Sequence, residues 1–233
     1  MALTKVIGNG VQGISNSSDA TAMTIGSDEH VDFAGNADFI DGRGVRLGNS
    51  DDFQLYHDGT DNHINVTGSQ TVNIQTSGNN AIGVDANGHV TKPLQPSFLA
   101  RPSSQQANLA INTIHSIAFG TEVFDRNADF ASNTFTAPIE GLYQLNVQLL
   151  IQQMDSATDY YYINLKTSNR NYDQYWDNND KAGDNGNGAG VSIVALADMD
   201  AGDTAVVEIS VANSGTAQMD VETASAFSGF LVC

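Results

Sequence analysis

Turn-forming residues interrupt the first ninety residues so often that no long helix fits between them. Strand-like segments recur about every seven to ten residues, and each is punctuated by Gly, Asn or Asp. The dipeptides DG, NG and SG supply the positive φ values that tight turns require. The candidate strands are ATAMTIG, HVDFAG, ADFIDG, GVRLG, DFQLYHDG, NHINVTG, QTVNIQTSG and AIGVDANGHV. This spacing predicts short β-strands between residues 13 and 90.

Each of these short strands carries only two or three apolar residues. A single chain of such strands cannot bury enough surface to fold as a compact monomer. If identical chains wind around a common axis, the same strands can share a core. A solenoid formed by one chain is the alternative, because the segment is repetitive in spacing but not in strict sequence. We predict a trimeric β-fibre shaft at residues 21–91.

A cluster of prolines divides the sequence. Three of its four prolines lie between positions 93 and 102, and the run KPLQP predicts an extended, non-helical linker at residues 92–96. The strand-like segments after it are longer and more apolar, which is typical of a β-sandwich. We therefore predict a separate head domain at residues 97–233.

The clearest strand of the head follows the corner FTAPIEGLY at residues 135–143. The sequence continues from Leu142 as LYQLNVQL, so Leu145, Val147 and Leu149 share one face and amide side chains share the other. This alternation is the signature of a strand with one buried and one polar face. Proline and glycine in the corner predict a sharp turn into that strand.

The composition favours β-structure and excludes two classes of partner. Charged residues make up only 15% of the chain, against about 25% in an average globular protein, and helix-forming Glu, Lys and Arg are scarce. A net charge of −18 at pH 7 repels phosphate backbones and anionic lipids, so we expect no nucleic-acid partner. No apolar run approaches the length of a membrane span, so we expect no membrane insertion. The fold class predicted is all-β.

Three motifs occur in a fixed order in the second half of the chain. They are FTAPIEGLY at residues 135–143, Leu196 followed by a Gly202-Asp203 turn, and FSGFL at residues 227–231. Together they resemble the globular head of the complement first component's q subunit and its tumour-necrosis-factor-like relatives. The resemblance is incomplete, because Val206 is displaced by one position from the family's pattern. The collagen stalk of animal members is also absent.

This resemblance implies a ten-stranded jelly-roll sandwich that trimerises along its long axis. The whole chain would then be an intertwined homotrimer in which the FTAPIEGLY corner leads into a central strand of the trimer core. The residues assigned to that trimer core are Phe135, Tyr143, Leu145, Val147, Phe227 and Phe230.

The first half resembles shaft segments of phage tail fibres, especially those of marine phages and cyanophages. The resemblance rests on GVRLGNSDDFQLYHDGTDNHI at residues 44–64 and on the N-terminal run MALTKVIGNGVQGIS. It implies that residues 1–20 attach to a tail or capsid protein of the virion and that the head meets a glycan or protein of the host surface. The protein would be a trimeric adhesin, synthesised in the host cytoplasm without a signal peptide and located in the virion.

Two other functions remain open. One is a structural virion protein, such as a head fibre or a capsid decoration, whose jelly roll is mainly a trimerisation clamp. The other is a secreted lectin-like protein, which the absence of a signal-peptide core disfavours.

A polar segment between Lys166 and Val191 holds the candidate binding residues. It contains the only tryptophan of the chain beside tyrosines and amides, which suits stacking on sugar rings and hydrogen bonding to hydroxyls. The alternative is that the aromatic residues pack under the segment or between subunits. The receptor-binding candidates are Tyr172, Tyr175, Trp176 and Asn178.

The same segment is rich in carboxylates. Oxygen-rich loops of this kind can bind calcium, although no EF-hand spacing is present. The alternative is that the acidic residues serve solubility in a solvated loop. The calcium-ligand candidates are Asp173, Asp177, Asp180 and Asp184, and no other cofactor is expected.

Catalysis is not expected. The acidic pairs at Asp51-Asp52 and at Asp198 and Asp200 stand beside Ser or Gly, where aspartates commonly cap turns. His57 and His63 flank the run DGTDN, where three chains could bring copies together around an ion. The alternative is that both histidines belong to a turn, because no histidine has the spacing of a zinc site.

Overall fold

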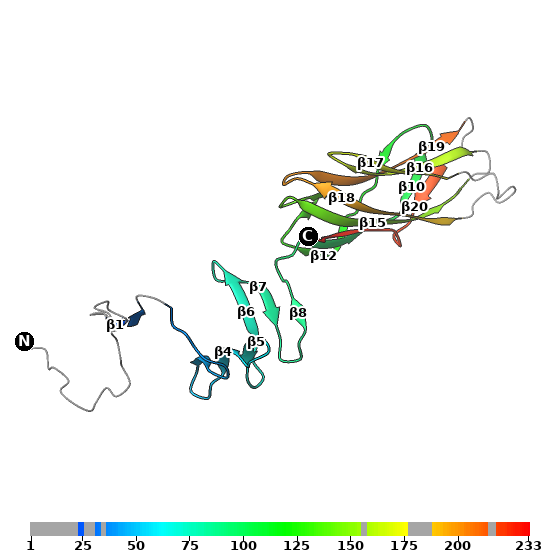
Figure 1. Cartoon of the computed structure of the whole chain (residues 1–233). Helices are drawn as coiled ribbons and strands as arrows, with labels where there is room; N and C mark the ends of the chain where they lie inside the picture. The colour runs from blue at the N-terminus through cyan, green and yellow to red at the C-terminus, as the bar shows by residue number, and fades with distance from the viewer. Residues whose placement is uncertain (1–22, 26–30, 34–35, 155–157, 177–187, 214–217) are drawn as a thin grey trace, which may run out of the picture. The chain divides into compact units, whose positions relative to one another are not determined.

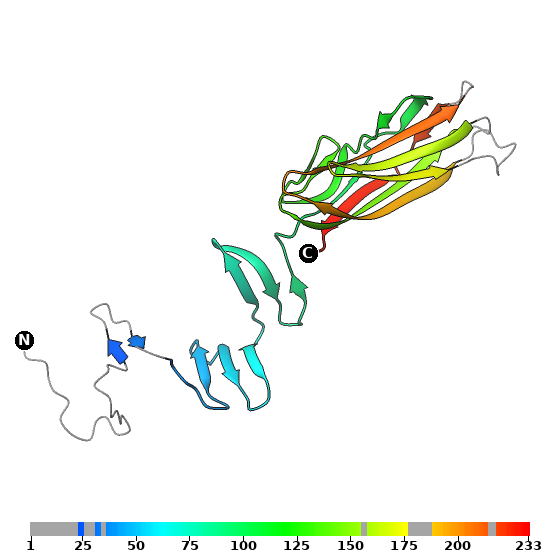
Figure 2. The ribbon, with the colours of Figure 1, turned by 45° about the horizontal axis from the view of Figure 1, so that its top comes forward.

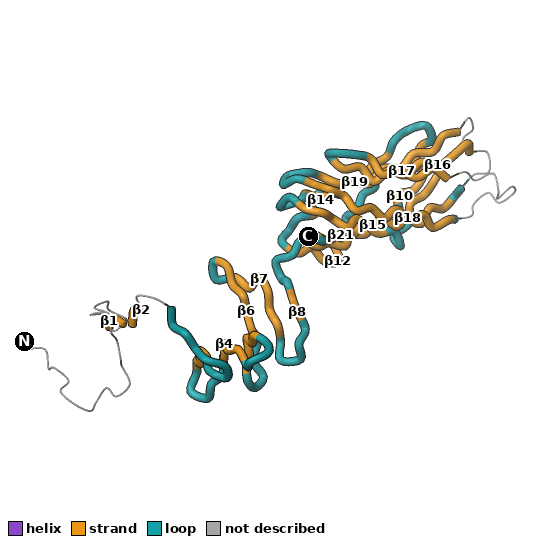
Figure 3. Tube along the Cα trace, in the orientation of Figure 1, coloured by secondary structure: helices purple, strands orange, loops and turns teal. Residues whose placement is uncertain are grey.

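The protein consists of β-strands and loops (Figure 1, Figure 3). The computed structural model describes residues 23–25, 31–33, 36–154, 158–176, 188–213 and 218–233. These residues contain no helix, so none of them belongs to a helix that could cross a membrane. The predicted all-β class is therefore confirmed. The chain divides into two compact units, Met1–Gln70 and Thr71–Cys233, which are described separately.

The first unit contains a two-stranded ladder and a three-stranded antiparallel sheet. The ladder pairs β1 (Met23–Ile25) with β2 (Val31–Phe33). The sheet is formed by β3 (Gly44–Leu47), β4 (Phe53–His57) and β5 (Asn62–Val66) in chain order.

The turn between β4 and β5 is built around one aspartate. Asp58 Oδ1 accepts hydrogen bonds from the backbone N–H groups of Thr60 and Asp61, each at 2.8 Å. Its second oxygen lies 2.9 Å from Nε2 of His63. These hydrogen bonds lower the pKa of the Asp58 carboxyl well below its usual range. The bond from the Asp61 N–H has the largest effect, and those from His63 and Thr60 come next. The DG dipeptide thus forms the tight turn that the sequence predicts, and Gly59 takes a φ of 101°.

One predicted strand of this region is absent. The segment ADFIDG, residues 37–42, was expected to be extended, but its end is a turn closed by the Arg43 N–H donating to the Ile40 carbonyl at 2.9 Å. Gly42 has a φ of 73° in this turn and donates its N–H to the His57 carbonyl at 2.7 Å. The apolar pair Phe39-Ile40 resembles a strand locally, but the glycine turn directly behind it ends any extension.

The second unit begins with another three-stranded antiparallel sheet. It consists of β6 (Val72–Thr76), β7 (Asn79–Val84) and β8 (Val90–Thr91). Ser77 and Gly78 join β6 to β7 with φ values of 49° and 79°. Two consecutive positive φ values are what a two-residue hairpin turn of the favoured twist requires.

The linker turns sharply instead of running extended as predicted. The Gln95 N–H donates to the Lys92 carbonyl at 3.1 Å, which closes a turn over the first proline of KPLQP. The Leu231 N–H then donates to the Pro96 carbonyl at 3.1 Å. The linker is thus hydrogen-bonded to the last strand of the following domain.

The rest of the second unit is a jelly roll of two packed sheets (Figure 1, Figure 2). The seven-stranded sheet comprises β9 (Ser97–Arg101), β10 (Gln106–Ala110), β12 (Thr121–Arg126), β15 (Gly141–Gln152), β18 (Ala189–Met199), β20 (Gln218–Val221) and β21 (Ala226–Leu231). The six-stranded sheet comprises β11 (His115–Ser116), β13 (Phe130–Ala131), β14 (Thr134–Thr136), β16 (Thr158–Thr167), β17 (Asn171–Trp176) and β19 (Thr204–Asn213).

Strand β15 lies in the middle of the seven-stranded sheet. It pairs with β18 from Gly141 to Ile151 along one edge. Along the other edge it pairs with β21 and β20. Its alternate residues Leu145, Val147 and Leu149 are at most 1% exposed, as the alternation in the sequence predicts. The FTAPIEGLY corner is the connection that carries the chain from β14 in one sheet to β15 in the other.

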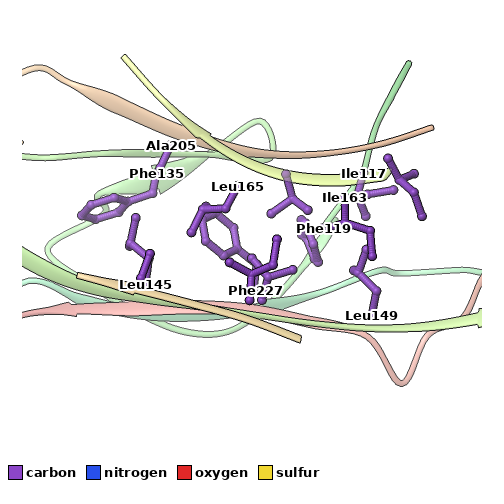
Figure 4. Packing of buried hydrophobic residues seen from close by; sticks show 14 of the residues in the cluster. Ile117, Phe119, Phe135, Leu145, Leu149, Ile163, Leu165, Ala205 and Phe227 are labelled. Atoms are coloured by element: carbon purple, nitrogen blue, oxygen red, sulfur yellow. The ribbon is translucent and has the colours of Figure 1, made fainter. Parts of the chain in front are cut away.

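The core between the two sheets is centred on aromatic rings (Figure 4). Phe98 stacks on Phe130 and on Phe135, with ring centroids 4.9 and 4.8 Å apart. Phe227 meets the edge of Phe98 at 4.9 Å. These rings come from four different strands, so one cluster holds both sheets together.

Candidate binding surfaces of the jelly roll

Five of the six residues predicted for the trimer core lie inside a single chain. Phe135, Tyr143, Leu145, Val147 and Phe227 are at most 1% exposed in the sandwich. A side chain covered by its own sheets cannot also contact another chain, so their assignment to a shared core is corrected. The period-2 alternation identifies a buried face but does not say whether the same chain or a neighbour covers it. Phe230 points the other way and is 46% exposed.

The outward face of the seven-stranded sheet carries exposed apolar side chains. Register places Leu196 beside Gln144 and Gln144 beside Phe230 across three strands. In the next row Val194 lies beside Asn146. Val194, Leu196 and Phe230 are 69%, 53% and 46% exposed. Contiguous exposed apolar side chains of this kind mark interaction surfaces in soluble proteins.

The predicted binding loop begins as a strand. Residues 171–176 form β17, which pairs with β16 from Asn171 opposite Lys166 to Trp176 opposite Tyr161. The many Asn, Asp and Gln residues suggested a loop, but pairing with a neighbouring strand outweighs their weak β-propensity.

Pairing also divides the predicted receptor-binding residues between two faces. Trp176 is half-buried, packs against the core and lies 5.8 Å from the ring of the buried Tyr161. Tyr172 is also half-buried, and its hydroxyl donates to the Leu196 carbonyl at 3.5 Å. Tyr175 lies on the opposite face and is 64% exposed. Asn178 lies outside the described residues.

The calcium hypothesis stays a prediction. Asp177, Asp180 and Asp184 lie outside the described residues. Asp173 accepts a hydrogen bond from the Tyr162 hydroxyl at 2.6 Å. Among the residues that the structure describes, no group of three histidine, cysteine or carboxylate side chains is arranged to hold a metal ion.

Two tyrosines that the sequence analysis did not single out join Tyr175 on its face. The Tyr175 ring lies 5.3 Å from that of Tyr160 and 4.8 Å from that of Tyr162. Tyr161, between them, is fully buried. The run Tyr160-Tyr161-Tyr162 held the signal for this surface, because alternation along a strand puts its outer members on one face.

The domain that carries these surfaces matches a known family. The model of the C1q domain matches residues 97–232, more than half of the chain. The chain belongs to the C1q domain family. Domains of this family commonly form homotrimers and serve as structural or ligand-binding modules.

Similar solved structures include the globular domain of zebrafish complement 1qA protein. It is 17% identical, with a TM-score of 0.45, and the match covers 60% of this chain and 98% of the zebrafish chain. Murine APRIL is 15% identical, with a TM-score of 0.43, covering 59% of this chain and 98% of the murine chain. No curated protein matches this sequence.

Outside the C1q domain, the β3–β5 sheet has one apolar face. Register aligns Val45, Leu55 and Ile64 across its three strands. These side chains are 39%, 48% and 64% exposed. The next row on the same face is Leu47, Phe53 and Val66, whereas the opposite face carries polar side chains such as Gln54 and Asn65.

The β6–β8 sheet repeats this arrangement. One row across it is Val72, Val84 and Val90, and the next is Ile74 opposite Ile82. Ile74 is 56% exposed and Val90 is 63% exposed. Two successive sheets thus each present one apolar face whose side chains are partly exposed among the residues that the structure describes.

The aspartates and histidines considered for chemistry have structural contacts. Asp51 pairs with Arg46 at 2.7 Å. His57 Nδ1 lies 2.8 Å from the Asp61 carbonyl, in the turn that Asp58 caps. The Asp200 N–H donates to Asp203 at 2.9 Å within a turn of the C1q domain. These contacts fit the turn interpretation of both groups.

Proposed function

We propose that the chain is a homotrimeric fibre protein of a tailed bacteriophage that attaches the virion to the host cell surface. In this account residues 1–20, which lie outside the described residues, bind a tail or capsid protein. The β-rich segment that follows is a three-chain shaft, and the C1q domain is the distal head. No step is catalytic.

The observation that carries the proposal is the pair of one-sided sheets before the C1q domain. An apolar side chain left in water contributes nothing to stability, whereas a buried one contributes about 1.5–3 kcal/mol. Val45, Leu55 and Ile64 form one exposed row, and Ile74 and Val90 belong to the next sheet. Three chains arranged around an axis would turn these faces toward one another. Repeated short sheets with one apolar face suit a fibre shaft better than a compact enzyme.

The outward face of the seven-stranded sheet supports the same assembly in the head. Val194, Leu196 and Phe230 combine with the half-buried amides of Gln144 and Asn146. Such a mixture of apolar and hydrogen-bonding side chains is typical of subunit interfaces. Attachment by three identical heads would then act through avidity, because the second and third contacts form at high local concentration.

A structural role in the virion is the second candidate. The half-buried packing of Trp176 on Tyr161 favours it, because this removes the tryptophan from the surface available to a receptor. In that case the C1q domain would mainly hold the three chains in register.

The test is binding of the full-length protein to intact cells of candidate hosts. Sedimentation analysis first establishes the mass of the purified, fluorescently labelled protein. Saturable binding to one host, competed by unlabelled protein, supports the adhesin. A trimer that binds no cell of the phage's own host range contradicts attachment and favours the structural role. A monomer contradicts both.

A further inference from the structure

We propose that Tyr160, Tyr162 and Tyr175, on the outward face of the six-stranded sheet, form a binding site for a neutral carbohydrate chain. This inference rests on the proposed attachment function and names the surface and the ligand class. It replaces Trp176 as the centre of recognition.

The three tyrosines form one aromatic surface at the ends of two paired strands. Tyr162 lies directly opposite Tyr175 in the β16–β17 ladder, and Tyr160 is two residues away on the same face. Tyr175 and Tyr160 are 64% and 40% exposed. The Tyr160 ring stands nearly edge-on to that of Tyr175, at an interplanar angle of 60°. The cluster therefore leaves aromatic surface open to solvent, where the C–H face of a sugar ring can pack.

One member of the cluster is held in place. The Tyr162 hydroxyl donates to Asp173 Oδ1 at 2.6 Å. Burial and the Asp173 carboxylate both raise the pKa of the Tyr162 hydroxyl, so it stays protonated and keeps this hydrogen bond. A fixed ring beside the exposed Tyr175 reduces the entropy lost when a ligand binds.

Polar groups line a pocket beside Tyr160, on the side away from β17. A pocket of about 230 Å³ is lined by Tyr160 and the polar Ser210, Asn112 and Thr113, together with the apolar Ile114, Val211 and Ala212. Its hydroxyl and amide groups can both donate and accept hydrogen bonds. Aromatic faces beside such groups match the two sides of a sugar, which has apolar C–H patches and hydroxyls.

The charge of this face selects against anionic sugars. Asp173 lies beside Tyr162 through its hydrogen bond. Glu208 lies on the neighbouring strand, where its Oε1 accepts a hydrogen bond from Lys166 Nζ at 3.1 Å. The nearby lysine is therefore already paired, and Asp173 adds negative charge in a chain of net charge −18. Sialic acids, sulfated sugars and phosphates would be repelled.

The size of the surface argues against a protein partner. A whole aromatic side chain offers about 200 Å², so the exposed parts of Tyr160 and Tyr175 together offer roughly 200 Å². A stable protein interface needs about 800 Å² on each side. The tyrosine surface matches one or two sugar rings instead.

The position of the cluster fits recognition by a head. Strand β16 begins and β17 ends at the end of the jelly roll away from Cys233 (Figure 1). The chain enters the domain at the other end, where Ser97 pairs with Phe230. The apolar outward surface belongs to the other sheet, so a trimer that buries Val194 and Leu196 leaves the tyrosine face available.

The test uses the full-length protein on an array of neutral, amino-sugar, sialylated and sulfated oligosaccharides. The variants are Tyr160→Ala with Tyr175→Ala, and Asn171→Ala as the matched control on the same face of β17, outside the cluster. Tyr175→Phe keeps the ring and removes only the hydroxyl. Circular dichroism and sedimentation confirm that each variant keeps the fold and the oligomeric state.

We expect the wild-type protein to bind neutral glycans and the double variant to lose about tenfold or more in affinity. Asn171→Ala and Tyr175→Phe should bind within about twofold of the wild type. No glycan binding, binding to anionic glycans alone, or undiminished binding by the double variant would each overturn the site. Cell binding by the wild type is measured separately. If cells are bound and the double variant binds them equally, the tyrosine site fails while the proposed attachment function stands.

Discussion

Replacing Ile64 with threonine tests the shaft at the most exposed apolar position of its two three-stranded sheets. Ile64 is 64% exposed in a single chain and belongs to the Val45, Leu55 and Ile64 row. Threonine keeps the β-branch but removes about two carbon groups, each contributing about 0.8 kcal/mol when buried. Only the part of Ile64 that is exposed in a single chain can be buried by trimerisation. Multiplied by that exposed fraction, the loss in free energy of trimer formation is about 1 kcal/mol per chain and about 3 kcal/mol per trimer. The dissociation constant of the trimer should rise roughly 100-fold.

Asn65→Thr is the matched control, because it introduces the same residue at the next position, on the polar face. It should change the stability by less than about 0.5 kcal/mol per chain. The assay is sedimentation of both variants and the wild type over a dilution series in moderate urea. Equal behaviour of Ile64→Thr and Asn65→Thr would refute the shared apolar axis, because in a monomer Ile64 faces water and loses little when replaced.

Three further predictions concern the C1q domain. Phe227→Ala should lower the free energy of unfolding by about 3–5 kcal/mol in urea titrations, because Phe227 is 0% exposed; a loss below about 1 kcal/mol would contradict the aromatic core. Gly229→Ala should cost about 1–3 kcal/mol in the same assay, since its Cβ would lie 2.6 Å from Leu145 Cδ2 and 2.9 Å from Phe98 Cε1; unchanged stability would show that this contact relaxes. Burial, with Asp125 nearby, raises the pKa of the Asp129 carboxyl, so this group disfavours folding once the pH rises above its ordinary value of 3.8. Asp129→Asn should therefore raise the melting temperature at pH 7 and change it little at pH values well below the ordinary pKa. An equal effect at both pH values would show that ionisation of the Asp129 carboxyl does not destabilise the fold.

Local sequence signals predicted much of this fold. The DG and SG turns lie where expected, because Gly59 and Gly78 need positive φ values that other residues rarely adopt. The alternation from Leu142 predicted both the course of β15 and its buried face. Such features depend on neighbouring residues alone, so they can be recognised without the rest of the structure.

Features that depend on distant residues were predicted less well. The segment NYDQYW is polar enough to resemble a loop, and only its pairing with β16 makes it a strand and turns Trp176 inward. The alternation that includes Tyr143 and Leu145 correctly predicted that these side chains are buried. They are covered by the second sheet of the same chain and not by a neighbouring chain. The tyrosine surface arises where β17 places Tyr175 beside Tyr160. A register between strands cannot be derived from either strand's sequence alone.

The mass of the full-length protein in solution tests directly whether three chains assemble. A homotrimer predicts that sedimentation equilibrium gives about three times the 24.7 kDa of one chain, independent of concentration over a broad range. It further predicts that Ile64→Thr, but not Asn65→Thr, moves the onset of dissociation to higher protein concentration. A wild-type protein that sediments as a 24.7 kDa monomer at micromolar concentration would contradict the trimeric shaft and the attachment mechanism built on it.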